Sequence, residues 1–133
     1  MNDTLCFKSP YKINCKLQIG YKQIYKSLLN DKNDYSMITK FNEIAGLYFF
    51  VSNNCDLLYI GQSSNLSERI KQHFQDNDSG GLRYKLQNQP ELLEEINDST
   101  LYVFPYKGSE GERSKAEESF VKLYQPKINE KLK

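Results

Sequence analysis

Hydrophobic and polar positions form their clearest pattern between residues 46 and 61. Two runs of aromatic and aliphatic side chains, 46–51 and 57–61, flank a polar segment at 52–56 that is rich in turn-forming residues. Strand-forming runs on either side of such a segment are typical of a β-hairpin. The pattern therefore predicts an antiparallel pair of strands in the middle of the chain.

The register of this hairpin decides which side chains share a face of the sheet. With a four-residue loop at 53–56, Tyr48 lies opposite Gly61 and Phe50 lies opposite Tyr59. Tyr48 and Tyr59 are then diagonal neighbours on one face, and a slip of one residue would separate them. The same register pairs Ser52 with Leu57 and sends five apolar side chains to the other face, where a core is expected: Leu47, Phe49, Val51, Leu58 and Ile60.

The residues before the hairpin carry two further patterns. Apolar and polar residues alternate over 11–19, which predicts a half-buried strand with lysines on its outer face. After Gly20, apolar residues recur at helical spacing over 21–29, which predicts a helix. A loop is expected at 31–34. The apolar spacing in 35–45 is ambiguous and permits a short helix.

A capped helix is expected directly after the hairpin. Asn65 is placed to cap it, and Glu68 stands three residues further on, in the reciprocal capping position. Apolar residues at Leu66, Ile70 and Phe74 form the stripe that would face the core.

The second half of the chain contains further helices and one more strand. Segment 82–95 is expected to be helical in two pieces that are separated at Pro90, and 101–104 reads as a strand that Pro105 closes. A last helix is expected over about 112–124, before Pro126. Four of its side chains are expected to face inward: Ala116, Phe120, Leu123 and Tyr124.

Composition fits a single intracellular domain over residues 1–133. The chain is 38% hydrophobic, which supports a modest core and much polar surface. No apolar run is long enough to span a bilayer, and residues 1–10 lack the apolar stretch of a signal peptide. The three cysteines are widely spaced without a Cys-x-x-Cys pair, so they give no signal for a zinc site.

The net charge of +1 is unevenly distributed along the chain. Residues 1–45 carry seven lysines and four acids, residues 86–112 carry one lysine and six acids, and residues 113–133 carry six basic and three acidic residues. Two mildly basic ends around an acidic middle are compatible with a local positive surface but do not require a polyanionic partner.

Several short motifs stand in a fixed order along the chain. Gly46-Leu47-Tyr48 is followed, eleven residues later from tyrosine to tyrosine, by Tyr59-Ile60-Gly61. A Ser-Asn-Leu-x-x-Arg run then leads to Arg69, and His73 stands one helical turn beyond it. The chain closes with a Glu…Pro-x-x-Asn pattern over 117–129.

In this order and spacing the motifs resemble the signature of the GIY-YIG endonucleases. The resemblance covers roughly residues 44 to 130. It places Arg69 in the family's arginine position and His73 in a position usually held by His or Tyr. Alignment on Pro126 selects Glu117, rather than Glu118, as the metal-binding glutamate.

The resemblance implies an α/β (α+β) fold with a small three-stranded antiparallel sheet flanked by helices. Residues 46–130 would form this nuclease core, and residues 1–45 would add a strand and a helix at the N-terminus. It also implies hydrolysis of phosphodiester bonds in DNA that depends on a divalent metal, Mg²⁺ or Mn²⁺, in a repair, restriction or mobile-element nuclease.

The chemistry of the residues agrees with this reaction. Arg69 offers a planar cation that can hold two phosphate oxygens, and Glu117 offers one hard anionic metal ligand. Tyr48 and Tyr59 would share the activation and positioning of the attacking water, in roles that the sequence does not divide between them. His73 would relay the proton or bind phosphate.

Asn129 would brace the site by hydrogen bonding. Taken one at a time, these residues also have ordinary structural readings. Tyrosines are common in strands, and Arg69 with His73 fits a solvated helix face. Only the joint pattern favours catalysis.

Two features depart from the family pattern. Many members carry Lys or Arg directly after the second tripeptide, whereas this chain has Gln62, which can donate a hydrogen bond but carries no charge. Lys71 or the metal would then supply the missing positive charge. The added segment 11–30 contributes lysines, among them Lys12 and Lys16, that would contact the phosphate backbone, or the segment forms a dimer edge.

Two alternatives to a DNA endonuclease stay open. One is a nucleic-acid-binding module that has lost catalysis, to which Gln62 lends some support. The other is a nuclease directed at RNA. No zinc-finger spacing or long basic helix indicates a separate DNA-reading domain.

Overall fold

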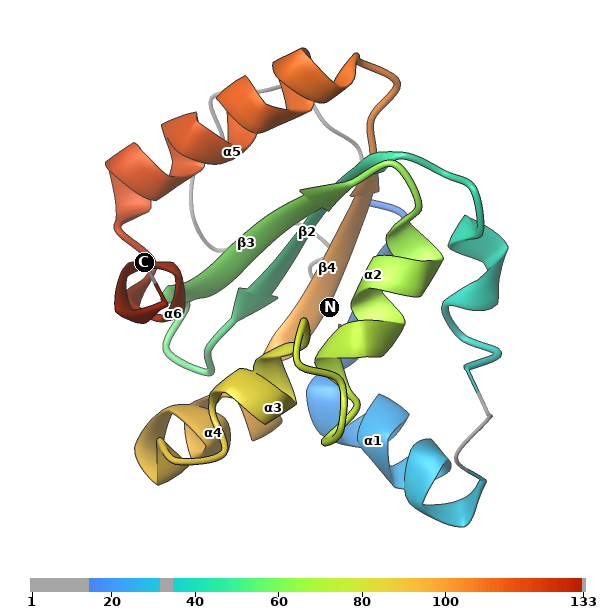
Figure 1. Ribbon diagram of the computed structural model, residues 1–133, viewed down its shortest axis with the longest axis vertical. Helices are drawn as coiled ribbons and strands as arrows, with labels where there is room; N and C mark the ends of the chain where they lie inside the picture. Colours follow the sequence, from blue (N-terminus) through green and yellow to red (C-terminus); the bar gives the residue numbers. More distant parts are fainter. Residues whose placement is uncertain (1–14, 32–34, 133) are drawn as a thin grey trace.

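A computed structural model describes residues 15–31 and 35–132 of the chain (Figure 1). The fold is mixed α/β, with helices around an antiparallel sheet whose strand order is β1-β4-β2-β3. The strands are β1 (Leu17–Gly20), β2 (Gly46–Val51), β3 (Leu57–Ser63) and β4 (Thr100–Pro105).

The sheet has four strands, so the expectation of three was wrong. The additional strand is β1, which pairs with β4 from Leu17 opposite Val103 to Gly20 opposite Thr100. It comes from the alternating segment that was expected to precede the core as an extension. The first part of that predicted strand, 11–14, lies outside the described residues.

Helices cover both faces and one end of the sheet. They are α1 (Tyr21–Asn30), the 3₁₀ turn η1 (Thr39–Phe41), α2 (Leu66–His73), α3 (Leu82–Lys85), α4 (Pro90–Asn97), α5 (Glu110–Tyr124) and α6 (Lys127–Lys131). The interruption expected at Pro90 is confirmed, since Pro90 occupies the first turn of α4, where its missing N–H costs no hydrogen bond.

The hairpin keeps its predicted register in its inner part and departs from it near the loop. Tyr48 pairs with Gly61 and Phe50 with Tyr59, as expected, but Val51 then pairs with Leu57. The pairing of Ser52 with Leu57 was therefore wrong. Because β3 contains an extra residue at this bulge, Leu58 joins the face of Tyr48, and Leu57 takes its place on the other face.

Each face of the sheet buries its own core. Helix α2 packs on the face that carries Tyr48 and Phe50, through Leu66, Ile70 and Phe74, which confirms the predicted stripe. Helix α5 packs on the opposite face through Ala116 and Phe120 (Figure 1). Strand β3 forms an edge of the sheet, and both helices contact it. Side chains from the two helices can therefore approach each other around this edge.

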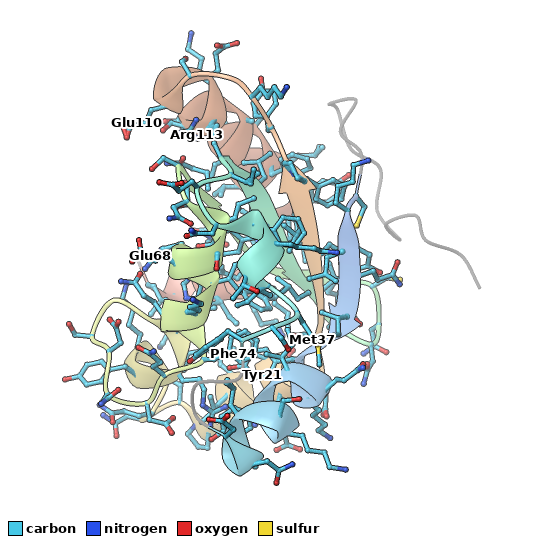
Figure 2. All side chains as sticks on the ribbon, turned by 90° about the vertical axis from the view of Figure 1, so that its right-hand side faces the viewer. Tyr21, Met37, Glu68, Phe74, Glu110 and Arg113 are labelled. Carbon is cyan, nitrogen blue, oxygen red and sulfur yellow. The ribbon has the colours of Figure 1, made fainter. Side chains whose placement is uncertain are left out.

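Helix α1 belongs to the same core as α2. The rings of Tyr21 in α1 and of Phe74, which caps the end of α2, stack with centroids 4.3 Å apart; both residues are labelled in Figure 2. The predicted amphipathic helix is confirmed, although Leu29 is 71% exposed.

Helix α5 begins two residues earlier than expected because Ser109 and Glu112 form a reciprocal capping box. Of its four predicted inward side chains, Leu123 was wrong, since it is 59% exposed. No helix in the described part of the chain is long and apolar enough to cross a membrane.

Candidate active site

The two hairpin tyrosines lie on one face of the sheet with their rings close together. Their centroids are 6.3 Å apart, and Tyr48 is fully buried whereas Tyr59 is partly exposed. Gly61 makes this packing possible, because a Cβ at that position would overlap the Tyr48 ring. The glycine of the second tripeptide therefore makes room for the tyrosine of the first.

His73, at the end of α2, points into the sheet and touches both phenols. Its Nε2 lies 2.7 Å from the Tyr48 hydroxyl, and its Nδ1 accepts a hydrogen bond of 3.1 Å from the Leu82 backbone N–H. A Cβ at Gly81 would overlap the Gln72 carbonyl, so the glycine lets the two segments cross closely enough for the Leu82 bond.

These two bonds fix the proton of the imidazole. Burial lowers the pKa of His73 well below its ordinary value, and the nearby cations Arg69 and Lys85 lower it further, so the ring is neutral near pH 7. A neutral imidazole has one donor and one acceptor nitrogen. Since Nδ1 accepts from Leu82, Nε2 carries the proton and donates it to the Tyr48 oxygen.

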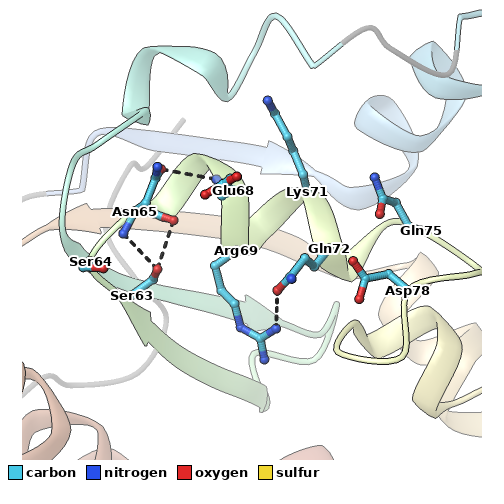
Figure 3. Close-up of a pocket in the computed structure, with 9 residues that line it drawn as sticks. All are labelled: Ser63, Ser64, Asn65, Glu68, Arg69, Lys71, Gln72, Gln75 and Asp78. Atoms are coloured by element: carbon cyan, nitrogen blue, oxygen red, sulfur yellow. Dashed lines mark hydrogen bonds between the residues drawn. The ribbon is translucent and has the colours of Figure 1, made fainter.

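Arg69 lies one turn before His73 on α2 and reaches toward both phenols. Its Nη1 donates to the Gln72 Oε1 at 2.6 Å and to the Gly80 carbonyl at 2.8 Å, which holds the guanidinium in place (Figure 3). The electrostatic influence of Arg69 extends to Tyr48, Tyr59 and Glu117. A single cation on α2 therefore interacts electrostatically with residues from β2, β3 and α5.

Glu117 approaches this group from the other side of the β3 edge. Burial raises the pKa of its carboxyl group, while the Arg69 guanidinium and a hydrogen bond from the Gln62 backbone N–H oppose that shift. Its neighbour Glu118 is exposed. The structure thus brings Glu117 to Tyr48, Tyr59 and Arg69.

Burial affects the two phenols unequally. It raises the pKa of Tyr48 well above its ordinary value, and the neighbouring Tyr59 adds to the shift. Burial also raises the pKa of Tyr59, but Arg69 opposes that shift most strongly, and the Tyr48 hydroxyl also lowers the pKa as a hydrogen-bonding neighbour. Tyr59 is therefore the phenol with more solvent access, although burial and the Glu117 carboxylate keep its pKa above the ordinary value.

Asn129 binds the backbone of the strand that carries Tyr59. Its Oδ1 accepts from the Ile60 N–H at 2.8 Å, and its Nδ2 donates to the Ile60 carbonyl at 3.0 Å. Because β3 lies at the edge of the sheet formed by the described residues, no strand among them pairs with these backbone groups. Helix α6, which sequence reasoning missed, positions this side chain.

Gln62 has a partner that the sequence did not reveal. Its Oε1 accepts a bond of 3.1 Å from Nε of Arg113, and Nη1 of Arg113 donates to the Gly108 carbonyl at 2.7 Å. Arg113 is only 6% exposed and stands one helical turn before Glu117 on α5 (Figure 2). Its position four residues before the candidate metal ligand is visible in the sequence, but its burial and its contact with Gln62 are not.

The predicted nucleic-acid contacts fall in different places. Lys71 lines a polar hollow of about 450 Å³ along α2, which also includes Ser63, Asn65, Arg69 and Gln75 (Figure 3). Lys16 precedes β1, at the opposite sheet edge from β3. Lys12 lies outside the described residues.

The side chains at the site include few ligands for a divalent cation. Within residues 15–31 and 35–132, no group of three or more His, Cys, Asp or Glu side chains is placed to hold a metal. A single half-buried carboxylate at Glu117 nonetheless fits Mg²⁺, which keeps several waters and takes few protein ligands. A cation there would also offset the desolvation of this carboxylate.

Comparison with known proteins identifies the class to which this fold and site belong. Residues 44–130 match the GIY-YIG catalytic domain. Similar proteins include UvrABC system protein C of Borrelia duttonii (strain Ly), 33% identical over 105 residues, and of Protochlamydia amoebophila (strain UWE25), 30% identical over 100 residues. These alignments cover 79% and 75% of this chain, respectively, and 15% of each relative.

The chain belongs to the GIY-YIG family, as its motifs indicated. UvrABC system protein C of Lactobacillus delbrueckii subsp. bulgaricus (strain ATCC BAA-365 / Lb-18) is similar as well, at 31% identity over 91 residues, 68% of this chain and 14% of that protein. The chain thus corresponds to about a seventh of the length of these relatives.

Proposed function

We propose that this protein is a DNA endonuclease that hydrolyses phosphodiester bonds with the help of a divalent metal ion. The observation that carries this proposal is the convergence of Arg69 and Glu117, from opposite faces of the sheet, on the paired phenols of Tyr48 and Tyr59. Phosphodiester hydrolysis needs a base for the attacking water and a cation for the phosphoryl oxygens.

Tyr59 is the residue we assign as general base. It is more accessible than Tyr48, and Arg69 and the Tyr48 hydroxyl both favour its ionised form. As phenolate it would take a proton from water while the water oxygen bonds to phosphorus. The bond from phosphorus to the leaving oxygen then breaks, and that oxygen leaves with a proton from solvent.

His73 and Tyr48 act behind Tyr59 as positioning residues. The hydrogen bonds run in one direction, from the Leu82 N–H to His73 and from His73 to the Tyr48 oxygen, which leaves the Tyr48 hydroxyl proton for Tyr59. In this tautomer His73 is a donor toward the phenols and not an acceptor of the proton. We therefore prefer this role to direct phosphate binding by a fully buried ring.

Glu117 is the residue that would hold the metal. When bound, the ion would offset negative charge on the phosphoryl oxygens. Arg69 would hold the same phosphate from the α2 side, and Asn129 would keep the strand segment around Tyr59 in register through its two bonds to Ile60. The polar hollow, which contains Lys71, would receive the adjoining DNA backbone.

Cleavage of a supercoiled plasmid with Mg²⁺ or Mn²⁺ tests this function. We expect metal-dependent relaxation or linearisation that EDTA abolishes. Arg69→Ala and Glu117→Ala should each reduce turnover by at least about a hundredfold, as expected when a group that stabilises the transition state is removed. Their circular dichroism should match that of the unmodified chain.

Glu118→Ala is the matched control, since its exposed carboxylate neighbours Glu117 in sequence and should leave cleavage unchanged. The site assignment is wrong if Arg69→Ala and Glu117→Ala cut as fast as the unmodified chain. Gel-shift binding without cleavage would favour an inactive binding module, and faster cutting of RNA than of DNA of the same sequence would favour an RNA-directed nuclease.

A further inference from the structure

An apolar hollow of about 600 Å³ lies at the end of the sheet where β2 begins and β4 ends. Its apolar wall consists of Phe41, Ile44, Ala45, Pro105 and Tyr106. Ile44 is 39% exposed, although large aliphatic side chains are usually buried. None of these residues belongs to the candidate active site.

The walls of this apolar hollow are fixed by backbone hydrogen bonds. The Tyr106 N–H donates to the Ala45 carbonyl at 2.9 Å, and the Ile44 N–H donates to the Phe41 carbonyl at 3.1 Å. The hollow is therefore formed before any ligand arrives, which is typical of small-molecule sites and reduces the entropy lost on binding.

The rim of the hollow is positively charged. Lys16, Lys40 and Lys107 surround it, against the single acid Glu43. Within the described parts of the chain, none of these lysines forms an ion pair with an acid. An apolar floor with an unneutralised basic rim fits a ligand that is flat and apolar in one part and anionic in another.

The apolar hollow lies near the polar hollow beside Arg69, because hydrogen bonds join the segments that line them. The Leu66 N–H, at the start of α2, donates to the Ile44 carbonyl at 2.9 Å, and the Asn65 Nδ2 donates to the Asn42 Oδ1 at 3.2 Å. Asn65 lines the polar hollow, and Ile44 lines the apolar one. The start of α2 therefore links the walls of the two hollows.

We propose that the apolar hollow binds one unpaired nucleotide of the nucleic-acid substrate, with its base against Ile44 and Tyr106 and its phosphates beside the lysines. This inference rests on the proposed endonuclease function, and it adds a preference for substrates that contain an unpaired base. Bases bind apolar and aromatic surfaces largely without regard to sequence, and lysines bind the flanking phosphates.

The test compares three DNA duplexes in a fluorescence anisotropy titration. One carries a single unpaired thymidine, one carries an abasic residue at the same unpaired position, and one is fully paired. The protein is the full chain with Glu117→Gln, a change that the proposed function expects to prevent cleavage, and EDTA is present in the titration. We expect the unpaired thymidine to be bound about tenfold more tightly than the abasic duplex, in line with the contribution of one stacked base.

Variants of the hollow distinguish the contribution of the base to binding from that of the phosphates. Ile44→Ser and Tyr106→Ala should each remove most of the preference for thymidine over the abasic residue. Lys40→Gln with Lys107→Gln should weaken binding of both bulged duplexes alike and make it less dependent on salt. Leu29→Ser is the matched control, because Leu29 is an exposed leucine on α1 and should leave the preference unchanged.

Equal affinity for the thymidine and abasic duplexes, or an unchanged preference in both Ile44→Ser and Tyr106→Ala, would overturn the proposal. The proposal would also be overturned if a polyglutamate peptide displaced the duplex from the unmodified chain but not from Ile44→Ser. The hollow would then be a docking site for an acidic protein segment. If the unmodified chain cuts plasmid but does not discriminate the base, only this inference fails. If it neither binds nor cuts any DNA, the proposed function fails with it.

Discussion

The two faces of the central sheet are equally well buried but differ in chemistry. On the α5 face, Phe49 packs edge-to-face on Phe104 and Phe120, with centroids 5.1 and 4.9 Å apart. On the α2 face, Tyr48 and His73 are as inaccessible as those phenylalanines, yet they place polar atoms in the interior. Burial is thus used for cohesion on one face and for a fixed hydrogen-bond chain on the other.

The apolar packing that stabilises the fold and the buried hydrogen-bond chain therefore lie on different faces of the sheet. Buried polar groups add little net stability even when they are satisfied, and they cost free energy when a partner is lost. The α2 face keeps such a chain where a phenylalanine would fill the same space. We therefore expect substitutions in the phenylalanine core of the α5 face to affect folding, and substitutions in the hydrogen-bond chain of the α2 face to affect activity and pH response.

The largest expected effect on folding comes from the α5 face. Phe120→Ala should lower the free energy of unfolding by about 3–5 kcal/mol, because it removes a fully buried ring and leaves a cavity. Urea denaturation followed by circular dichroism measures this loss. Turnover per folded molecule should stay near that of the unmodified chain.

Leu123→Ala serves as the control, since it lies on the same helix but is 59% exposed. It should change the free energy of unfolding by less than about 0.5 kcal/mol. A loss as large as that of Phe120→Ala would show that the assignment of the buried stripe of α5 is wrong.

An intermediate effect concerns the pH dependence of stability on the α2 face. His73 is the only histidine in the chain, and its pKa in the folded state is well below its ordinary value. As pH falls below about 6.5, the unfolded chain takes up a proton that the folded chain does not. The free energy of unfolding should therefore decrease with falling pH, by up to about 1.4 kcal/mol per pH unit, until the folded-state pKa is reached.

His73→Gln isolates this contribution in denaturation curves between pH 7 and 5. Whatever its stability at pH 7, this variant should lack the decrease that begins near pH 6.5. Glu117 acts in the opposite sense, because a raised carboxyl pKa makes the folded chain bind the extra proton as pH falls. It is present in both proteins, so its effect cancels in the difference. Parallel curves would contradict the assignment of His73 as a neutral, buried donor.

Local patterns were sufficient to predict most of the helices and strands. The inner register of the hairpin, the Asn65 cap and the break at Pro90 depend on neighbours in sequence, and all three are confirmed. Arg69 and Glu117, which the family spacing singled out, do approach the same phenols. These features could be predicted because each is set by period, capping or spacing alone.

The features that were missed depend on contacts between distant segments. The bulge at Leu58 changes which leucine faces α2, and a strict two-residue alternation does not reveal it. Likewise, the Leu82 N–H that fixes the tautomer of His73 and the Arg113 side chain that holds Gln62 come from other elements. Their roles follow from packing, which periodicity does not report.

The smallest expected effect lies at the β3 edge, between the two faces. Asn129→Ala removes two hydrogen bonds with the Ile60 backbone, one that Asn129 accepts from the N–H and one that it donates to the carbonyl. Water can replace part of them at an edge strand, so the free energy of unfolding should fall by only about 1 kcal/mol. Amide hydrogen exchange gives a local readout, in which the Ile60 N–H should exchange faster while the Phe120 N–H changes much less.

Asn129→Asp sharpens this test because it keeps one of the two bonds. Its carboxylate can still accept from the Ile60 N–H, but it cannot donate to the Ile60 carbonyl, and two acceptors then face each other. We therefore expect Asn129→Asp to cost at least as much stability as Asn129→Ala, although the Ile60 N–H stays better protected than in the alanine variant. If both variants leave the exchange of this N–H unchanged, Asn129 does not brace the strand, and the register of Tyr59 must depend on the β2 pairing alone.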